Sequence, residues 1–396
     1  MAIAAMGAAL LIPSRSFAQV TYHTLLEFSG VPAGGGPSGV TAGPNGVLYS
    51  MTGGGAFGEG AVVELQPPAS GTGPWTQNVL YSFTGQDGDG GTSQILSPLV
   101  VAPDGNIYGT TSSGGAYGGG IVFELQPPAS SGGDWTETIL YDLALYDDSI
   151  WQFASMVTMA DGRLYGVSPA GGIYNNGLVF ELRAPPGGSG AWSSSVLYTF
   201  TGTSDGAYPD GLTVGPDGVL YGTALGGGDY GQGVVFALQP PAVAGDAWSE
   251  NVLYSFQGEA AGSAAFGPPL ILKDGSLLGT TQTTLFELTP PAAGETTWTE
   301  TRIFGFGPDS TLVLHNGSVF FTISSLFCSY YCSGGVVYQL QPSQSGGSWT
   351  ATALKQFNGN EEPFGSLVID SHGWIFGTTL YGPGFLGSGI LYAIKP

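Results

Sequence analysis

The chain is poor in charge, and above all in positive charge. Only 9% of its 396 residues are charged, and 7 Lys and Arg stand against 29 Asp and Glu, which gives a formal net charge of −22. A chain of this kind repels polyanions, so nucleic acid and anionic membrane surfaces are poor partners for it. We interpret the acidity itself as a contribution to solubility.

Cysteine is scarce as well. Cys328 and Cys332 are the two cysteines of the chain, too few for a fold that is built on disulfide bridges. In an oxidising compartment we expect them to form one local disulfide. A metal is the alternative ligand for a Cys-x3-Cys pair, but the sequence offers no second pair of ligands.

Long apolar runs are missing, since no stretch approaches the ~20 residues of a membrane-spanning helix. The short apolar run 2–12 is followed by Ser16-Phe17-Ala18, a small-x-small cleavage site. This order is typical of a secretory signal peptide, although the basic n-region is absent. We therefore expect residues 1–18 to be a signal peptide and residues 19–396 to form a single domain. The predicted location is secreted or at a bacterial cell surface.

Glycine and aromatic residues, in contrast, are abundant. The chain contains 69 Gly, and aromatic residues make up 12% of it. Disordered chains that are rich in glycine lack such aromatic content, and they also lack the frequent Val, Ile and Thr found here. The composition therefore favours an all-β protein with many tight turns.

Three short strings recur along the chain. They are Trp75-Thr-Gln-Asn-Val-Leu-Tyr-Ser-Phe83, Asn106-Ile-Tyr-Gly-Thr-Thr111 and Ile121-Val-Phe-Glu-Leu125. The first string returns every 50 to 60 residues, by subtraction of its tryptophan positions, which are Trp75, Trp135, Trp192, Trp248, Trp298 and Trp349. A repeat of this length fits one blade of a β-propeller.

Each repeat predicts four antiparallel strands, A to D. Strand A ends in an Asn-Gly or Asp-Gly pair, for which we expect a type I′ turn into strand B. Pro127-Pro128 ends strand C, because proline donates no hydrogen bond to the ladder. Strand D alternates, so that Val196, Tyr198 and Phe200 are expected on one face.

The two ends of the chain are predicted to meet in one blade. Residues 20–28 match strand D, whereas residues 390–396 match strand C. With seven B strands and seven C strands, we predict an all-β, seven-bladed β-propeller of four-stranded antiparallel blades. Its last blade is closed by the N-terminal strand, which leaves no exposed edge.

The repeat also resembles a known family. Gly-Asn-Ile-Tyr-Gly-Thr-Thr, Gly-Gly-Ala-Tyr-Gly-Gly-Gly and Ile-Val-Phe-Glu-Leu follow one another within residues 105–125, and this order is similar to the tandem repeat of GloVer-type exported bacterial proteins. The resemblance covers nearly the whole mature chain. It implies a C-terminal surface anchor in many members, and the end at Pro396 inside the last predicted blade departs from that. It implies no established activity and assigns no catalytic residue.

The B-to-C and D-to-A loops are expected to share one face, where propeller ligands usually bind. Most B-to-C loops combine glycines with an aromatic ring that could stack on sugars or hold peptides. The candidate ligand-binding residues are Phe57, Tyr117, Tyr174, Tyr230, Tyr330 and Tyr381. The alternative, which their regular recurrence favours, is that each ring fills a fixed place in its own blade. Blade 5 lacks the loop, and blade 6 carries the cysteines there.

Carboxylates are the other candidates on this face. Asp87, Asp89, Asp205 and Asp210 are assigned to D-to-A loops and could hold calcium, which takes about six to eight oxygen ligands. The spacing lacks the distal Glu of a calcium loop, and Asp also caps turns, so we expect no cofactor, with calcium as the alternative. Paired carboxylates could also support glycoside hydrolysis.

Three functions remain open for the chain. The first is an exported, non-catalytic propeller that binds a glycan or a protein on its B-to-C and D-to-A loop face. The second is a secreted carbohydrate-active or lactone hydrolase that uses Asp residues, with or without calcium. The third is a structural scaffold at the cell surface. No Ser-His-Asp set and no phosphate loop suggests itself, so the first is preferred, and we expect a monomer.

Overall fold

A computed structural model describes the protein over residues 20–30, 34–69, 73–86, 88–91, 98–130, 132–143, 157–160, 162–185, 191–243, 245–258, 262–305, 307–308, 310–324, 334–343, 349–358, 361–382 and 388–396. The expected signal peptide lies outside these ranges. The same holds for Asp87, for Tyr330 and for both cysteines.

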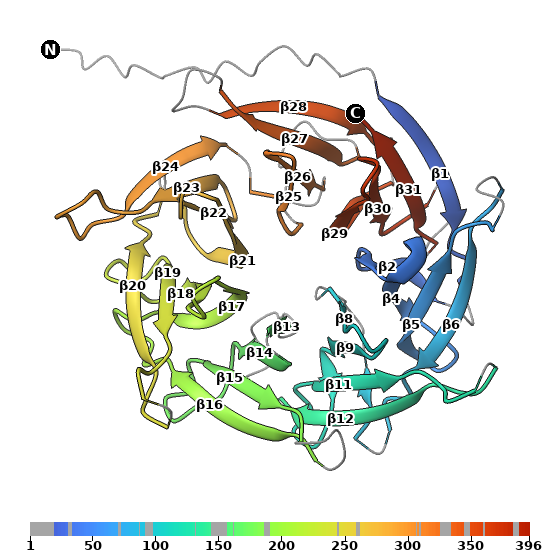
Figure 1. Cartoon of the computed structure of the whole chain (residues 1–396), viewed down its shortest axis with the longest axis horizontal. Coiled ribbons are helices and arrows are strands. Elements are labelled where there is room, and N and C mark those ends of the chain that lie inside the picture. Colours follow the sequence, from blue (N-terminus) through green and yellow to red (C-terminus); the bar gives the residue numbers. More distant parts are fainter. Residues whose placement is uncertain are drawn as a thin grey trace, which may run out of the picture.

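Seven antiparallel sheets surround a central axis (Figure 1), as the repeat predicts. Blade 1 comprises β2 (Gly35–Pro37), β3 (Thr41–Ala42), β4 (Leu48–Gly54), β5 (Gly58–Gln66) and β6 (Thr76–Ser82). Blade 2 comprises β8 (Val100–Val101), β9 (Ile107–Thr110), β11 (Ile121–Gln126) and β12 (Thr136–Asp142). Blade 3 comprises β13 (Val157–Ala160), β14 (Arg163–Ser168), β15 (Leu178–Arg183) and β16 (Ser193–Thr199).

The second half of the ring repeats this order. Blade 4 comprises β17 (Ala207–Val214), β18 (Leu220–Gly226), β19 (Val234–Gln239) and β20 (Ser249–Ser255). Blade 5 comprises β21 (Ala265–Ile271), β22 (Leu277–Thr281), β23 (Leu285–Thr289) and β24 (Thr299–Phe304). Blade 6 comprises β25 (Val313–His315), β26 (Ser318–Ile323), β27 (Val336–Pro342) and β28 (Trp349–Gln356). In each blade the first strand is the innermost and the last is the outermost (Figure 1).

Blade 7 joins the two ends of the chain. It comprises β29 (Pro363–Ile369), β30 (Ile375–Thr379), β31 (Ile390–Lys395) and β1 (Thr21–Glu27). Strand β1 pairs antiparallel with β31 from Thr21 opposite Lys395 to Glu27 opposite Ile390, and the first and last parts of the chain lie side by side in Figure 1. The predicted closure by the N-terminal strand is confirmed, and it leaves no unpaired edge at the ring's seam.

The hydrophobic core lies between neighbouring blades rather than inside each one. One buried cluster, for example, combines Tyr49 and Met51 of blade 1 with Ile107 and Phe123 of blade 2. The tryptophan that opens each repeat's outer strand reaches back onto the preceding blade, and the Trp192 ring lies 5.6 Å from the Tyr108 ring. The recurring tryptophan therefore packs its own blade against the preceding one.

A glycine in the middle of strand B has a packing role. In blades 2, 3, 4 and 5 this residue of strand B pairs with a buried phenylalanine of strand C, and a Cβ added to the glycine would collide with that ring. Gly222, which pairs with Phe236, is one such case. In blade 1 the pair is Ser50 and Val63, a larger residue opposite a smaller one.

A bulge between strands C and D alters which D-strand residues are buried. In blade 3 Val179 pairs with Tyr198 and Phe180 with Val196, so Leu197 is the extra residue. Leu197 packs against the core, whereas 55% of Val196 is exposed. The predicted alternation along strand D is therefore wrong at Val196, because one extra residue reverses the two faces of a strand.

The A-to-B turns are of two kinds. Asn45 and Asn316 have φ of 57° and 50° and are each followed by a glycine with positive φ, as a type I′ turn requires. Asp104 is not among the residues with positive φ, and the Gly105 N–H donates to Ala102 O at 3.0 Å. Asp217-Gly218 and Asp274-Gly275 repeat this geometry, so that only the glycine is left-handed, and the type I′ prediction is wrong for these three pairs.

The described residues contain one short 3-10 helix, Pro44–Gly46, and no helix that is long and apolar enough to cross a membrane.

Candidate functional site

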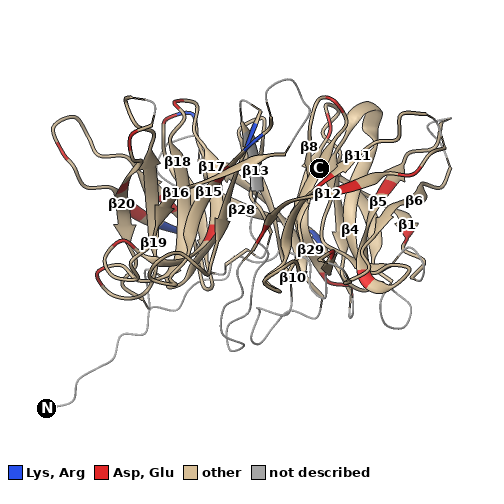
Figure 2. Cartoon of the chain, turned by 90° about the horizontal axis from the view of Figure 1, so that it is seen from below, with Lys and Arg blue, Asp and Glu red and all other residues tan. Residues whose placement is uncertain are grey.

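The two loop sets that were expected to share a face do so. The short strand β7 (Gly90–Gly91) of the first D-to-A connection pairs with β10 (Ser113–Gly114) of the next B-to-C loop. We call this side of the ring the B-to-C face; it is the lower rim in Figure 2. The opposite side, which carries the A-to-B turns and the C-to-D loops, is the A-to-B face.

The B-to-C loops hold their aromatic residues at the tip of a tight turn. In blade 2 the Gly118 N–H donates to Gly115 O at 3.3 Å, so that Tyr117 is the third residue of a four-residue turn. Blades 3 and 4 repeat this geometry with hydrogen bonds of 3.2 and 3.1 Å around Tyr174 and Tyr230. Gly115 has φ of +73°, and a Cβ there would press on Ile121 and Asp142, so the glycine is required.

The turns of blades 1, 2 and 4 are also tied to the outer strand of their own blade. The backbone N–H before the aromatic residue donates to a side chain at the end of strand D: Ala116 N to Asp142 Oδ1 at 2.6 Å, Ala56 N to Ser82 Oγ and Asp229 N to Ser255 Oγ, both at 3.4 Å. The turns therefore lie toward the outer part of the B-to-C face and away from the innermost strands.

The aromatic side chains are exposed to solvent. The exposed fractions are 64% for Phe57, 65% for Tyr117, 55% for Tyr174, 56% for Tyr230 and 40% for Tyr381. The interpretation that each ring fills a place inside its blade is therefore wrong. Phenylalanines of strand C, such as the fully buried Phe180, fill that place instead.

The set of loops is not symmetric. Blade 5 replaces the aromatic turn by a short connection in which the Thr281 N–H donates to Thr284 O at 2.8 Å. Tyr330 of blade 6 lies outside the described residues. The exposed rings therefore occupy blades 1 to 4 and blade 7 of the part that is described.

Two of the candidate carboxylates cap their own loops. Asp205 Oδ2 accepts from Thr201 N at 2.7 Å and from the Tyr198 hydroxyl at 3.0 Å. Asp89 Oδ2 accepts in the same way from Thr84 N at 2.6 Å and from the Tyr81 hydroxyl at 3.5 Å. Both carboxylates thus bind the chain at the end of the preceding strand D, which is the ordinary role of Asp in a turn.

Asp210 has a different position from the one expected. It belongs to the innermost strand β17 and not to the D-to-A loop, and its Oδ2 accepts the N–H of Gly267 from the next blade at 2.7 Å. Burial raises the pKa of Asp210 above its ordinary value, and the hydrogen bond from Gly267 offsets part of this effect. The side chain therefore joins two innermost strands beside the central axis.

No metal cluster accompanies these carboxylates in the described part of the chain. There, no three residues among His, Cys, Asp and Glu come together in a way that could hold an ion. Asp205 and Asp210, although close in sequence, bind partners on different elements. The calcium hypothesis gains no support from their geometry.

Sequence reasoning missed two glutamates that face these loops from the next blade. Burial, together with the charge of Asp89, raises the pKa of Glu137 from its ordinary value of 4.5 to about 7. Burial and the charge of Asp205 do the same for Glu250. In both residues Oε1 is buried without a hydrogen-bond partner. The signal was present, because a glutamate stands two residues after the recurring tryptophan in both repeats.

The chain is similar to one described family of repeats. The Gloeobacter/Verrucomicrobia repeat matches residues 14–214 and, in a second match, residues 97–333. No curated protein sequence matches the chain.

Several solved propellers have a similar fold. A catalytically inactive virginiamycin B lyase from Staphylococcus aureus, solved with quinupristin, has 14% identity and a TM-score of 0.54 over 96% of this chain and 100% of its own. PorZ, a surface component of the type-IX secretion system of Porphyromonas gingivalis, has 15% identity and a TM-score of 0.53 over 89% of this chain and 46% of its own. A Trichoderma reesei carbohydrate-active enzyme of family AA12 has 11% identity and a TM-score of 0.50 over 97% of each chain. At these identities the likeness concerns the fold alone.

Proposed function

The chain belongs to the Gloeobacter/Verrucomicrobia repeat family, and we propose that this member is an exported, non-catalytic propeller that binds a glycan or a protein on its B-to-C face. The observation that carries the proposal is the set of exposed rings on that face, whose exposed fractions run from 40% to 65%. Isolated exposed apolar residues need no explanation, but an exposed ring in the loops of five blades on a single face of the molecule is a pattern that packing does not demand.

The turns prepare these rings for binding. The turns of blades 2, 3 and 4 are each closed by a backbone hydrogen bond, and those of blades 1, 2 and 4 are also tied to strand D. A rigid backbone loses little conformational entropy when a ligand arrives, and a tyrosine has only two side-chain torsions to fix. A tyrosine ring also offers an apolar face for stacking and a hydroxyl for hydrogen bonding, which suits both sugars and peptides.

Removing three of the rings should abolish ligand binding. We expect Tyr117→Ala, Tyr174→Ala and Tyr230→Ala in one protein to weaken binding to a glycan-array or peptide-array hit by more than about 100-fold, since anchors of this type contribute ~1–2 kcal/mol each. The far-ultraviolet spectrum and the melting temperature should be unchanged, because the rings are exposed.

Val243→Ala is the matched control. Val243 is 63% exposed in the C-to-D loop of blade 4, on the A-to-B face, so its loss should leave binding intact. Unchanged binding by the triple variant would refute the assignment of the site to these rings.

One observation supports the hydrolase as a second candidate. Asp210 is a carboxyl of raised pKa on an innermost strand, and carboxyl groups of raised pKa are candidates for acid–base catalysis. Asp210→Asn should then abolish any turnover found on a panel of lactones and glycosides, while Asp217→Asn, in an A-to-B turn, should keep it. The absence of turnover by the unchanged protein, with and without calcium, would count against this candidate.

A further inference from the structure

A buried glutamate recurs in the middle of strand C. Glu124 of blade 2 and Glu181 of blade 3 occupy the same position, with 5% and 1% exposure. A buried carboxylate has to be compensated by hydrogen bonds or by a positive charge. The two blades meet this need in different ways, so that one serves as the internal control of the other.

Blade 2 compensates its glutamate with neutral groups. Glu124 Oε1 accepts from Asn106 Nδ2 at 2.9 Å and from the Tyr108 hydroxyl at 2.7 Å, and Oε2 accepts from Gln126 Nε2 at 3.2 Å. Two amides and a phenol are therefore sufficient to bury this carboxylate in the fold.

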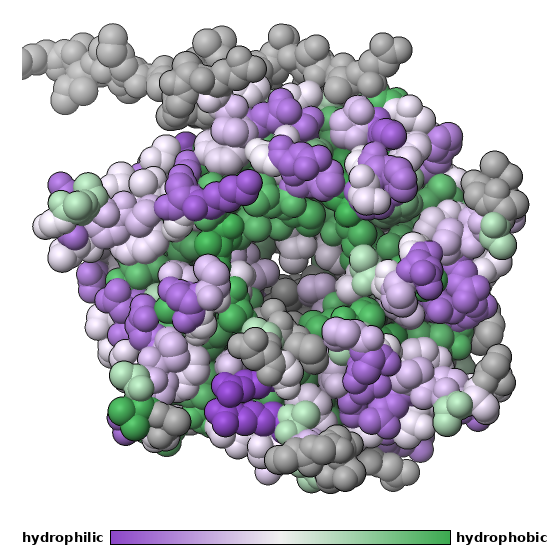
Figure 3. Space-filling view, viewed as in Figure 1, coloured by the Kyte–Doolittle hydropathy of each residue, from purple (hydrophilic) through white to green (hydrophobic). Residues whose placement is uncertain are grey.

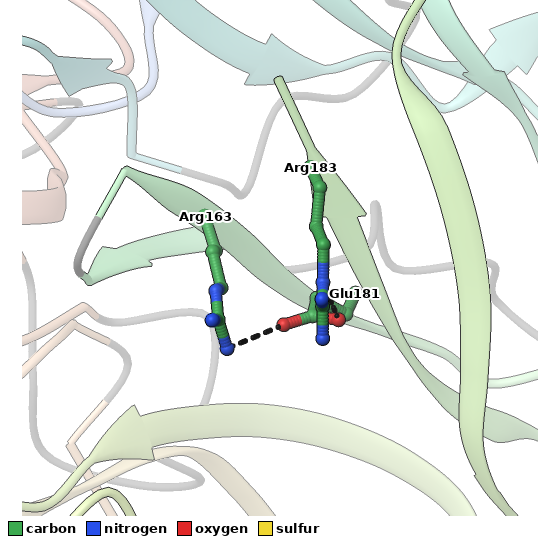
Figure 4. Close-up of polar contacts among 3 residues, drawn as sticks. All are labelled: Arg163, Glu181 and Arg183. Atoms are coloured by element: carbon green, nitrogen blue, oxygen red, sulfur yellow. Dashed lines mark hydrogen bonds and ion pairs between the residues drawn. The ribbon is translucent and has the colours of Figure 1, made fainter. Parts of the chain in front are cut away.

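Blade 3 places two arginines where blade 2 has the amides. Arg163 Nη1 lies 3.2 Å from Glu181 Oε1 and Arg183 Nε lies 2.6 Å from Oε2. The register fixes the equivalence, because Leu164 pairs with Leu182 as Ile107 pairs with Leu125. Figure 4 shows the two arginine side chains running in the same direction, with the guanidinium groups of both close to the Glu181 carboxylate.

This arrangement carries more positive charge than the glutamate requires. Two guanidinium groups against one carboxylate leave a net charge of about +1 at this point, in a chain with only 7 Lys and Arg and a net charge of −22. The arginine side chains are 43% and 54% exposed, while the glutamate is 1% exposed. Arg183 donates to the carboxylate through Nε rather than through a terminal nitrogen.

The two arginines are open to solvent on the A-to-B face. Figure 3 shows that face, on which strongly hydrophilic colour lies over β14 and β15. Elsewhere Asp and Glu are spread over both rims of the ring (Figure 2), so anions are repelled from most of the surface.

We propose that Arg163 and Arg183 form an anion-binding site on the A-to-B face of blade 3, and that it takes a singly charged oxyanion such as the carboxylate of an acidic sugar. Guanidinium groups bind planar oxyanions through two parallel hydrogen bonds, which fits a carboxylate. Glu181 is a positioning residue, because it holds the two guanidinium groups in place and is itself buried. The site lies on the opposite face from the aromatic turns and does not rest on the function proposed for them.

Replacing the two arginines by the residues at the equivalent positions of blade 2 tests the site. Titration calorimetry with sodium glucuronate, acetate and sulfate, at constant ionic strength set with chloride, should show saturable binding to one site. The double variant Arg163→Asn and Arg183→Gln should lose at least about 10-fold in affinity for each anion that binds. It should melt within a few degrees of the unchanged protein, because blade 2 folds with the same amides. Binding of glucuronate alone would identify a sugar acid, and binding of glucuronate and acetate would identify a general carboxylate site. Sulfate binding as tight as that of the carboxylates would overturn the assignment to a singly charged oxyanion.

Two controls separate the site from general electrostatics and from the B-to-C face. Lys273→Gln removes an exposed charge from the A-to-B turn of blade 5 and should leave anion affinity unchanged. The triple tyrosine variant should also bind the anion normally. If the double variant fails to fold, Arg183→Gln alone should give the same loss, since Arg163 then still pairs with Glu181. Absence of saturable binding by the unchanged protein, or an equal loss in Lys273→Gln, would overturn the proposal.

Discussion

Replacing Gly222 by Ser should lower the free energy of unfolding by about 2–3 kcal/mol. A Cβ at this position would collide with the ring of Phe236, which is fully buried between blades 3 and 4. The ring itself contacts Phe200 at a centroid distance of 5.1 Å, and protein interiors are packed too closely for such a ring to move freely. Urea denaturation, followed by tryptophan fluorescence, measures the change.

A second substitution in the same pair should restore much of this loss. Phe236→Val alone should cost about 2–3 kcal/mol through the cavity that it leaves. Combined with Gly222→Ser it recreates the Ser50 and Val63 pair of blade 1, so the double variant should be more stable than the sum of the two losses by about 1–2 kcal/mol. Strict additivity of the two losses would show that the glycine is not required to make room for the Phe236 ring.

Raising the pH from 5 to 8 should destabilise the protein. Glu137 and Glu250 have a pKa of about 7 in the folded state against 4.5 as their ordinary value, because burial and the charges of Asp89 and Asp205 disfavour ionisation. The folded state therefore binds more protons than the unfolded state between these values, and stability falls as the pH rises from about 4.5 through about 7.

The size of this effect follows from the shift of the pKa. One pKa unit is worth about 1.4 kcal/mol, and screening by solvent at these partly exposed groups reduces the contribution to ~1–2 kcal/mol for each glutamate. Tyr81 and Tyr198 face the same pairs and stay neutral in this range, because burial and the neighbouring carboxylates raise their pKa values.

Glutamine at both positions isolates the effect. Glu137→Gln with Glu250→Gln should flatten the fall in stability between pH 5 and 8, measured by urea denaturation at several pH values, and should raise stability at pH 8. Glu295→Gln is the control, since Glu295 is exposed in a C-to-D loop and should leave the pH profile as it is. A profile that keeps its slope in the double variant would show that other groups cause it.

The architecture could be predicted from the sequence because its signals are local. Turn glycines, the paired prolines after strand C and the alternation of apolar residues act within a few neighbouring positions, and their repetition along the chain gave the number and order of the blades. The match of residues 20–28 to strand D even indicated how the ring closes. The prediction of buried and exposed positions in strand D was wrong where a bulge adds one residue, as at Leu197.

The side-chain environments were decided by contacts between blades. The sequence determined a seven-bladed propeller with glycine-rich aromatic turns on one face, since each of these features is specified within its own repeat. Only the tertiary structure decided that Asp210 reaches Gly267, that Glu250 faces Asp205 and that the exposed rings stand clear of the core. The physical reason is that burial and charge depend on neighbours about 50 residues away in the next blade. Those neighbours are set by how one blade packs on the next, which no local pattern records.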